Sequence, residues 1–189
     1  MPPVEAAGNP RAERLEHGRE AYARREWRGA HASLETADRA MPLGAEDLEL
    51  LATSASMLGR DDEHLQVLER AHHGHLEAGE TLRAARCALW AGTHLLIRGE
   101  TARGAGWLAR AQRLVEQEKR DCVERGYLLV PMMMGQEAAG DSAAAYDTAV
   151  AAAGIGERFG AYHRRIAFDR IARCWRSTPQ YFLCAVGQL

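Results

Sequence analysis

Residues that favour β-strands are scarce in this sequence. Its 189 residues include only 7 Val, 4 Ile and 7 Thr, against 35 Ala and 18 Gly. Alanine has the highest helix propensity, whereas β-branched residues are the ones enriched in strands. The composition therefore argues against a sheet and predicts an all-α fold. With 47% hydrophobic and 26% charged residues, the chain has the make-up of one or at most two globular domains.

Long apolar runs and closely spaced cysteines are also missing. The longest apolar run, 127–134, is far shorter than the roughly 20 residues that a membrane span needs. The N-terminus has no basic segment followed by an apolar core, so we expect a cytoplasmic protein without a membrane partner. The cysteines, at positions 87, 122, 174 and 184, lie too far apart in the sequence for a metal clip or redox couple. We expect them to be small buried residues.

A strong charge of one sign is absent as well. The formal net charge is -2, which argues against nucleic-acid binding by this chain alone. One segment is uneven: after residue 160, Asp169 is the single acidic residue among five arginines, Arg164, Arg165, Arg170, Arg173 and Arg176. With nearby Tyr and Trp side chains that can stack on bases, these arginines keep a nucleic-acid binder open as an alternative.

What the sequence does contain is an internal repeat. Four series of residues advance by the same steps of 34, 40 and 41 positions. Small residues at such positions let two antiparallel helices cross closely, while leucines fill the space beside them. Two members, His64 and Met133, are too large for this pattern and put close packing of the second and fourth units in doubt. The series are Gly18, Ala52, Gly92, Met133; Ala30, His64, Gly104, Ala145; Leu34, Leu68, Leu108, Ala149; and Ala37, Ala71, Ala111, Ala152.

Apolar residues three and four apart predict two amphipathic helices in each unit, joined by a short turn. Gly59, Gly99 and Gly140 are expected to end helices in a left-handed conformation. The residue two positions later, Asp61, Thr101 or Ser142, is expected to cap the next helix, whereas the turn at 25–27 has no glycine. Pro131 predicts a kink or a late start in the seventh helix. The expected helices span 10–25, 27–41, 45–58, 61–78, 80–98, 101–119, 121–139, 142–159 and 161–175.

These features resemble two known families. Gly18, Ala30, Leu34, Ala37 and Pro42 match the small-residue and closing-proline pattern of the tetratricopeptide repeat, whose unit is 34 residues. Residues 83–92 (RAARCALWAG), 98–115, 124–131 (ERGYLLVP) and 154–160 (GIGERFG) resemble the helical-repeat region of actinobacterial LuxR-type transcriptional regulators. The phrase GWLARA at 106–111 is the most specific part. The family's helix-turn-helix domain has no counterpart here, and neither does a nucleotide-binding phosphate loop.

The resemblance implies a right-handed, tetratricopeptide-like solenoid of about four helical hairpins over residues 10–160. Residues 1–9 would form a flexible N-terminus, and 161–189 a C-terminal capping helix and tail. The function implied is that of a non-enzymatic, regulatory protein-interaction module without a cofactor, and a homo-oligomer is compatible with it.

In such repeats the first helix of each hairpin lines a concave groove, where a protein or peptide ligand binds. By carry-over, the partner-binding residues are Leu15, Arg19 and Tyr22; Glu49, Thr53 and Ser56; Arg86, Leu89, Thr93 and Leu96; and Tyr127, Val130, Met134 and Glu137.

A histidine cluster supports a second alternative. His64, His72 and His75 lie within about three helical turns, with Asp61 and Asp62 near in sequence. Zinc needs three or four converging ligands, so these histidines would serve a metal-binding protein or a metal-dependent enzyme. The chain has no H-E-x-x-H motif, and packing between helices explains the same histidines without a metal.

Overall fold

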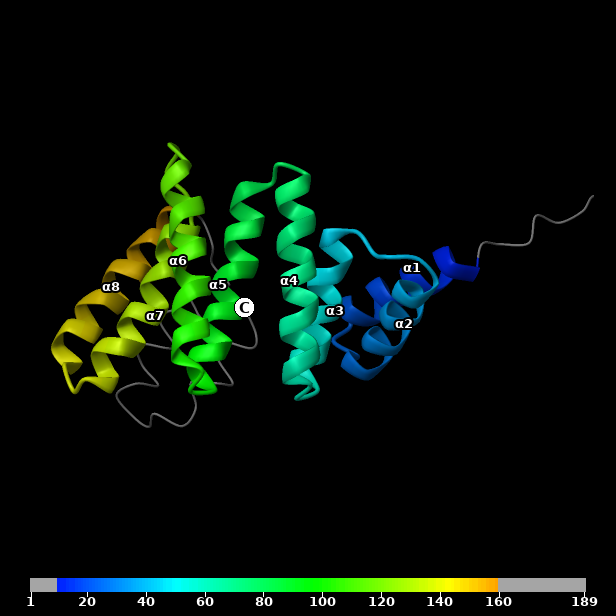
Figure 1. The fold of residues 1–189 in the computed structure, drawn as a ribbon, viewed down its shortest axis with the longest axis horizontal. Helices are drawn as coiled ribbons and strands as arrows, with labels where there is room; N and C mark the ends of the chain where they lie inside the picture. The colour runs from blue at the N-terminus through cyan, green and yellow to red at the C-terminus, as the bar shows by residue number, and fades with distance from the viewer. Residues whose placement is uncertain (1–9, 160–189) are drawn as a thin grey trace, which may run out of the picture. The chain divides into compact units, whose positions relative to one another are not determined.

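The computed structural model describes residues 10–159, and this part of the chain contains eight helices and no strand (Figure 1). The prediction of an all-α fold is confirmed. The expected ninth helix, the C-terminal arginines and the N-terminal segment 1–9 lie outside the described residues. Within those residues, no helix is long and apolar enough to cross a membrane.

The chain divides into two compact units, Met1–Glu77 and Ala78–Leu189. Unit 1 contains α1 (Pro10–Ala23), α2 (Trp27–Ala40), α3 (Ala45–Met57) and α4 (Asp61–Glu77). Unit 2 contains α5 (Thr81–Ile97), α6 (Thr101–Gln117), α7 (Glu124–Ala138) and α8 (Ser142–Arg158). In each unit the helices pack as two consecutive hairpins, α1 with α2, α3 with α4, α5 with α6 and α7 with α8. The first helices of the two hairpins also contact each other, α1 with α3 and α5 with α7.

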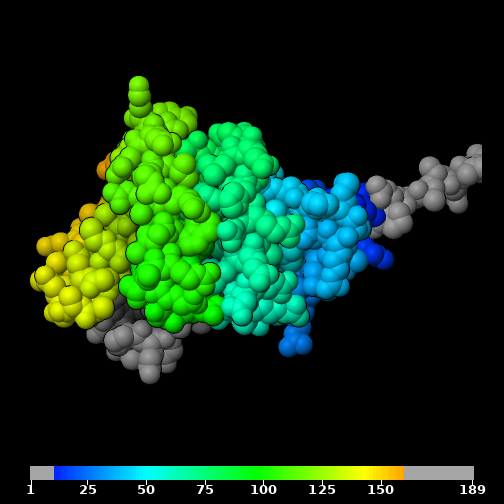
Figure 2. All heavy atoms as spheres, in the orientation of Figure 1, coloured from blue at the N-terminus to red at the C-terminus, as the bar shows by residue number. Residues whose placement is uncertain are grey.

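Two of the hairpins cross at glycines, as the repeat predicts. A Cβ on Gly18 would lie 2.8 Å from Leu34 Cγ, and one on Gly92 would lie 2.8 Å from Leu108 Cγ. The Gly92 position is also 3.0 Å from the backbone oxygen of Gly104. Both distances are too short for a real side chain, so the absence of a Cβ is what lets α1 approach α2 and α5 approach α6. Figure 2 shows all heavy atoms as spheres in the orientation of Figure 1.

The second hairpin has a buried histidine at its helix crossing. His64 of α4 lies where the other hairpins have alanine or glycine, and its Nδ1 donates a hydrogen bond to the backbone oxygen of Ala52 on α3, at 2.8 Å. The ring is buried. The His64 side chain thus joins α3 and α4. At the matching position of the third hairpin, the backbones of α5 and α6 approach each other directly.

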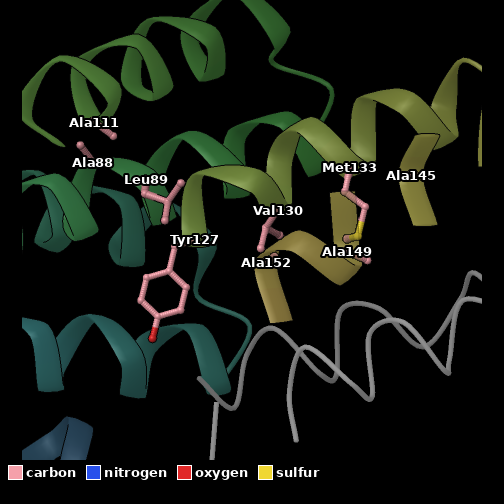
Figure 3. Close-up of a cluster of buried hydrophobic side chains, with 9 residues drawn as sticks. All are labelled: Ala88, Leu89, Ala111, Tyr127, Val130, Met133, Ala145, Ala149 and Ala152. Carbon is pink, nitrogen blue, oxygen red and sulfur yellow. The ribbon is translucent and has the colours of Figure 1, made fainter. Parts of the chain in front are cut away.

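The fourth hairpin exchanges the large and the small residue. Met133 replaces the small residue of α7, and Ala149 replaces the leucine that α2, α4 and α6 carry at the matching position. Both side chains are buried in one apolar cluster, with Val130, Ala145 and Ala152 among its members (Figure 3). Volume-conserving changes are the ones that cores tolerate best. The large side chain of Met133 is therefore accommodated by the small side chain of Ala149, and not by looser packing of the hairpin.

All four hairpin turns have the same hydrogen-bond pattern. Gly59, Gly99 and Gly140 have φ between 72° and 82°, which confirms the predicted left-handed ends. In the last turn, for example, Asp141 N–H donates to Gln136 and Gly140 N–H to Glu137, the pair of bonds that defines a Schellman motif. In the first turn a non-glycine residue, Arg25, takes this conformation with φ 60°.

The predicted helix caps are wrong by one residue. Asp61, Thr101 and Ser142 are the first residues of their helices rather than the residues before them. In α8 the cap is Asp141, whose carboxylate accepts from Ala144 N–H at 3.0 Å. In α6 the preceding residue, Glu100, makes no side-chain capping bond. The last residue of a Schellman turn, for example Asp141, is also the residue directly before the next helix. The capping position therefore lies one residue earlier than predicted.

The seventh helix starts late, at Glu124 instead of 121, and Pro131 lies in its interior. Proline has no N–H to donate, so one bond of the helical ladder is missing there. The start at Glu124 is not the late start that the proline predicted, because Pro131 still lies seven residues inside the helix.

Replacing Arg25 with glycine should stabilise unit 1. A left-handed non-glycine residue costs roughly 1–2 kcal/mol, and glycine offsets part of that gain by its freedom in the unfolded chain. We expect Arg25→Gly to raise the free energy of unfolding in urea by about 1 kcal/mol. As a control, Ala32→Gly at an exposed position in the interior of α2 should lower it, because glycine is unfavourable in a helix interior. A loss of stability in both variants would contradict the assigned turn.

The exchange in the fourth hairpin predicts coupling between Met133 and Ala149. Met133→Ala leaves a cavity and should lower the free energy of unfolding by about 2–4 kcal/mol. Ala149→Leu alone overpacks the core and should cost about 1–3 kcal/mol. The double variant should be more stable than the sum of the two losses predicts, by at least about 1 kcal/mol in a double-mutant cycle. Strictly additive losses would show that the two side chains do not share one space.

Candidate functional site

An ion pair joins the two first helices of unit 1. Arg19 of α1 binds Asp47 of α3 through two hydrogen bonds, Nε to Oδ1 at 2.8 Å and Nη2 to Oδ2 at 2.9 Å. Asp47 is buried, while Arg19 remains partly exposed. The hydrogen bond to Asp47 is the main cause that raises the pKa of the Arg19 guanidinium. The pair fixes α1 against α3 and leaves one edge of the guanidinium, near Glu16, open to solvent.

The other predicted residues of unit 1 lie on the same two helices, α1 and α3. Tyr22 contacts the Trp27 ring edge-on, with ring centroids 5.5 Å apart. The Thr53 hydroxyl donates to the Glu49 backbone oxygen at 2.9 Å, and the Glu49 carboxylate accepts from His75 Nε2 at 2.5 Å. Tyr22, Glu49 and Thr53 are all half-buried. We call Arg19, Tyr22, Glu49 and Thr53 the unit 1 first-helix surface.

The histidines of α4 are used in packing. His64 binds the Ala52 backbone oxygen, and His75 is fully buried against Glu49. His72 is buried, with its ring edge-on to exposed His73. Within the described part of the chain, His64, His72 and His75 are not gathered into one set of metal ligands. The geometry gives the proposed metal site of these three residues no support.

Two further polar contacts join the second helices of unit 1. Asp38 of α2 and Arg70 of α4 form a bidentate ion pair at 2.7 and 2.8 Å. His31 Nε2 donates to Glu63 Oε1 at 2.8 Å. The hydrogen bond from Arg70 is the main cause that lowers the pKa of Asp38. Neither pair is predicted from the sequence, although each joins residues 32 positions apart, close to the repeat length.

The first helices of unit 2 carry a charged pair and, one turn further along, an aromatic pair. Arg86 of α5 lies 3.7 Å from Glu124 of α7, measured from Nη2 to Oε1. Trp90 of α5 and Tyr127 of α7 have ring centroids 6.0 Å apart. Residues three or four apart share one side of a helix, so the two pairs follow each other along the same side of α5 and α7.

Arg86 is the least satisfied member of this group. Its Nε atom is buried and has no hydrogen-bond partner. The 3.7 Å contact to Glu124 is an ion pair but too long for a hydrogen bond. Buried polar atoms in folded proteins are normally bonded, so this guanidinium has donors to spare.

The remaining predicted residues of unit 2 divide into core and surface. Thr93 is buried and donates to the Leu89 backbone oxygen at 2.9 Å, and Tyr127 belongs to the apolar cluster of Figure 3. Met134 and Glu137 are half-buried on α7. We call Arg86, Trp90, Met134 and Glu137 the unit 2 first-helix surface. Trp90 and Glu124 were missed by sequence analysis; their spacing from Arg86 and Tyr127 was the available signal.

The Asp38–Arg70 pair predicts a pH-dependent contribution to stability. Because the pKa of Asp38 is lowered in the folded state, its contribution is complete above the unfolded value of about 3.9 and is lost as pH falls through the lowered pKa. Arg70→Gln should therefore cost about 1 kcal/mol of unfolding free energy at pH 7 and almost nothing near pH 2. Arg39→Gln, which removes an exposed pair with Glu35, is the matched control with a small effect throughout. An Arg70→Gln cost that is equal at both pH values would refute the assignment.

Comparison with known proteins finds no matching family model and no match among curated proteins. The functional conclusion therefore rests on the geometry of the two first-helix surfaces.

Proposed function

We propose that this protein is a non-enzymatic interaction module that binds a protein or peptide partner through its first-helix surfaces. The observation that carries the proposal is that the first helices of consecutive hairpins pack side by side in each unit. At these seams they carry polar and aromatic side chains, of which Arg19 is exposed and Tyr22 and Trp90 are half-buried. Tyr, Trp and Arg are the residue types enriched at the energetic centres of protein interfaces.

The finer architecture is part of the same proposal. Four hairpins, two of them crossing at glycines, Schellman turns between their helices and contacts between the first helices of each unit fit a right-handed, tetratricopeptide-like solenoid. In this arrangement the first-helix surfaces line a concave face. The role that follows is the sensor or autoregulatory region of a LuxR-type transcriptional regulator, in which the chain reports a partner to a DNA-binding domain.

The ion pairs between hairpins suggest how binding would be transmitted. Arg19–Asp47 and Asp38–Arg70 each tie one hairpin of unit 1 to the next. A partner that contacts Arg19 favours one arrangement of these hairpins over others, and only such differential binding shifts a conformational equilibrium. The signal is then a change in the angle between hairpins rather than a chemical reaction.

Site-specific photo-crosslinking in the source cells tests this proposal. A photoreactive residue at Thr53, on the unit 1 first-helix surface, should give one discrete adduct with a partner. The same residue at Glu69, which is exposed on α4, should not give that adduct. A hydrophobic and hydrogen-bonding anchor is lost in Tyr22→Ala, so we expect the Thr53 adduct to fall at least about fivefold, in line with hot-spot truncations above 1 kcal/mol.

The matched control is Tyr146→Ala, which removes an exposed tyrosine of α8 and should leave the adduct unchanged. Circular dichroism of each variant shows whether it is folded. The proposal fails if folded protein gives no adduct from Thr53, or if Thr53 and Glu69 give the same adducts.

A further inference from the structure

Each unit has an arginine–carboxylate pair between its two first helices, and the two pairs differ in their hydrogen bonding. In unit 1, Arg19 meets Asp47 through two hydrogen bonds of 2.8 and 2.9 Å. In unit 2, Arg86 stands 3.7 Å from Glu124 and keeps a buried Nε without a partner. A guanidinium has five N–H donors and prefers a bidentate carboxylate. Arg86 therefore has N–H donors for a second carboxylate, which the described residues do not supply.

The accessible charge at this place is positive. The Arg86 side chain is 32% exposed, whereas that of Glu124 is 7% exposed. A ligand therefore meets the guanidinium and not the carboxylate. Glu124 holds Arg86 in place from the buried side. The carboxylate of a ligand then supplies a hydrogen-bond partner that the Arg86 guanidinium lacks. A basic group would face an exposed cation without reaching the buried anion.

An aromatic neighbour defines the second half of the site. Trp90 lies one turn along α5 from Arg86, is half-buried, and is held against Tyr127 of α7. Four helical residues rise about 6 Å, and two residues of an extended peptide advance about 6.7 Å. An extended segment running along α5 thus places side chains two positions apart, which point the same way, against Arg86 and Trp90.

We propose that the partner bound at unit 2 is an extended segment with an acidic residue two positions from a large apolar residue. The carboxylate binds Arg86, and the apolar side chain packs on Trp90 beside Tyr127. This inference rests on the proposed function, since it specifies the ligand of one of its two surfaces.

Fluorescence anisotropy with capped peptide pools tests the chemistry directly. Each labelled 10-residue pool has Leu and Glu fixed one, two, three or four positions apart, and Ala, Ser, Thr or Asn elsewhere. The spacing of two should bind the full-length protein most tightly. Replacing Glu with Gln in that pool removes a charge-assisted bond and should weaken binding about tenfold.

Variants locate the effect at Arg86. In Arg86→Gln the preference for Glu over Gln should disappear. Glu124→Gln removes the competing internal carboxylate and should tighten binding of the Glu pool several-fold, a gain that a merely structural role for this pair would not give. Arg83→Gln, on the same helix and paired with Glu80, is the matched control and should keep the preference. If Arg86→Gln unfolds because Glu124 is left unpaired, Arg86→Gln/Glu124→Gln restores neutrality and carries the same expectation.

The outcomes separate this inference from the proposed function. Pools that bind without a preference for Glu, or whose preference survives in the folded Arg86 variants, overturn the acidic ligand. Absence of binding by every pool overturns it as well. In both cases an adduct from Thr53 would still support the interaction module, whereas loss of that adduct would remove the proposed function itself.

Discussion

Close crossing of two antiparallel helices is the constraint on which the structure depends. At each crossing the two helices share a fixed space, and the chain fills it in three ways. Gly18 and Gly92 leave the space to a leucine of the second helix, His64 fills it and bonds to the opposite backbone, and Met133 faces an alanine. Interiors are close-packed, so a large residue at one position of a crossing can be matched by a small one at another, as Met133 is by Ala149. This is why a repeat persists although its individual positions vary.

Charged contacts between hairpins are better formed in unit 1 than in unit 2. In unit 1 they include well-formed ion pairs, Arg19–Asp47 and Asp38–Arg70, which lie at or near the surface. In unit 2 the seam between α5 and α7 includes Leu89, Tyr127 and Val130 in one apolar cluster. Apolar burial is non-directional, whereas bidentate pairs fix orientation.

The same contrast bears on what each first-helix surface offers a partner. In unit 1 the arginine is satisfied internally, and recognition falls to half-buried neighbours such as Tyr22 and Thr53. In unit 2 the contact of Arg86 with Glu124 is too long for a hydrogen bond, and its guanidinium keeps unused donors beside Trp90. An incomplete pair at a packed seam is costly to the fold, because buried donors without partners are unfavourable. A ligand that completes the pair recovers that free energy as affinity.

The sequence by itself determined the all-α fold, the approximate span of each described helix and the left-handed turns at Gly59, Gly99 and Gly140, because periodicity and glycine conformation are local properties. Only the tertiary structure decided the partners. It showed that His64 bonds to Ala52, that Met133 is matched by Ala149, that Thr93 and Tyr127 are buried, and that Arg86 is left with free donors. These facts depend on distances between residues far apart in the chain. Such distances follow from how helices pack, and no single segment encodes them.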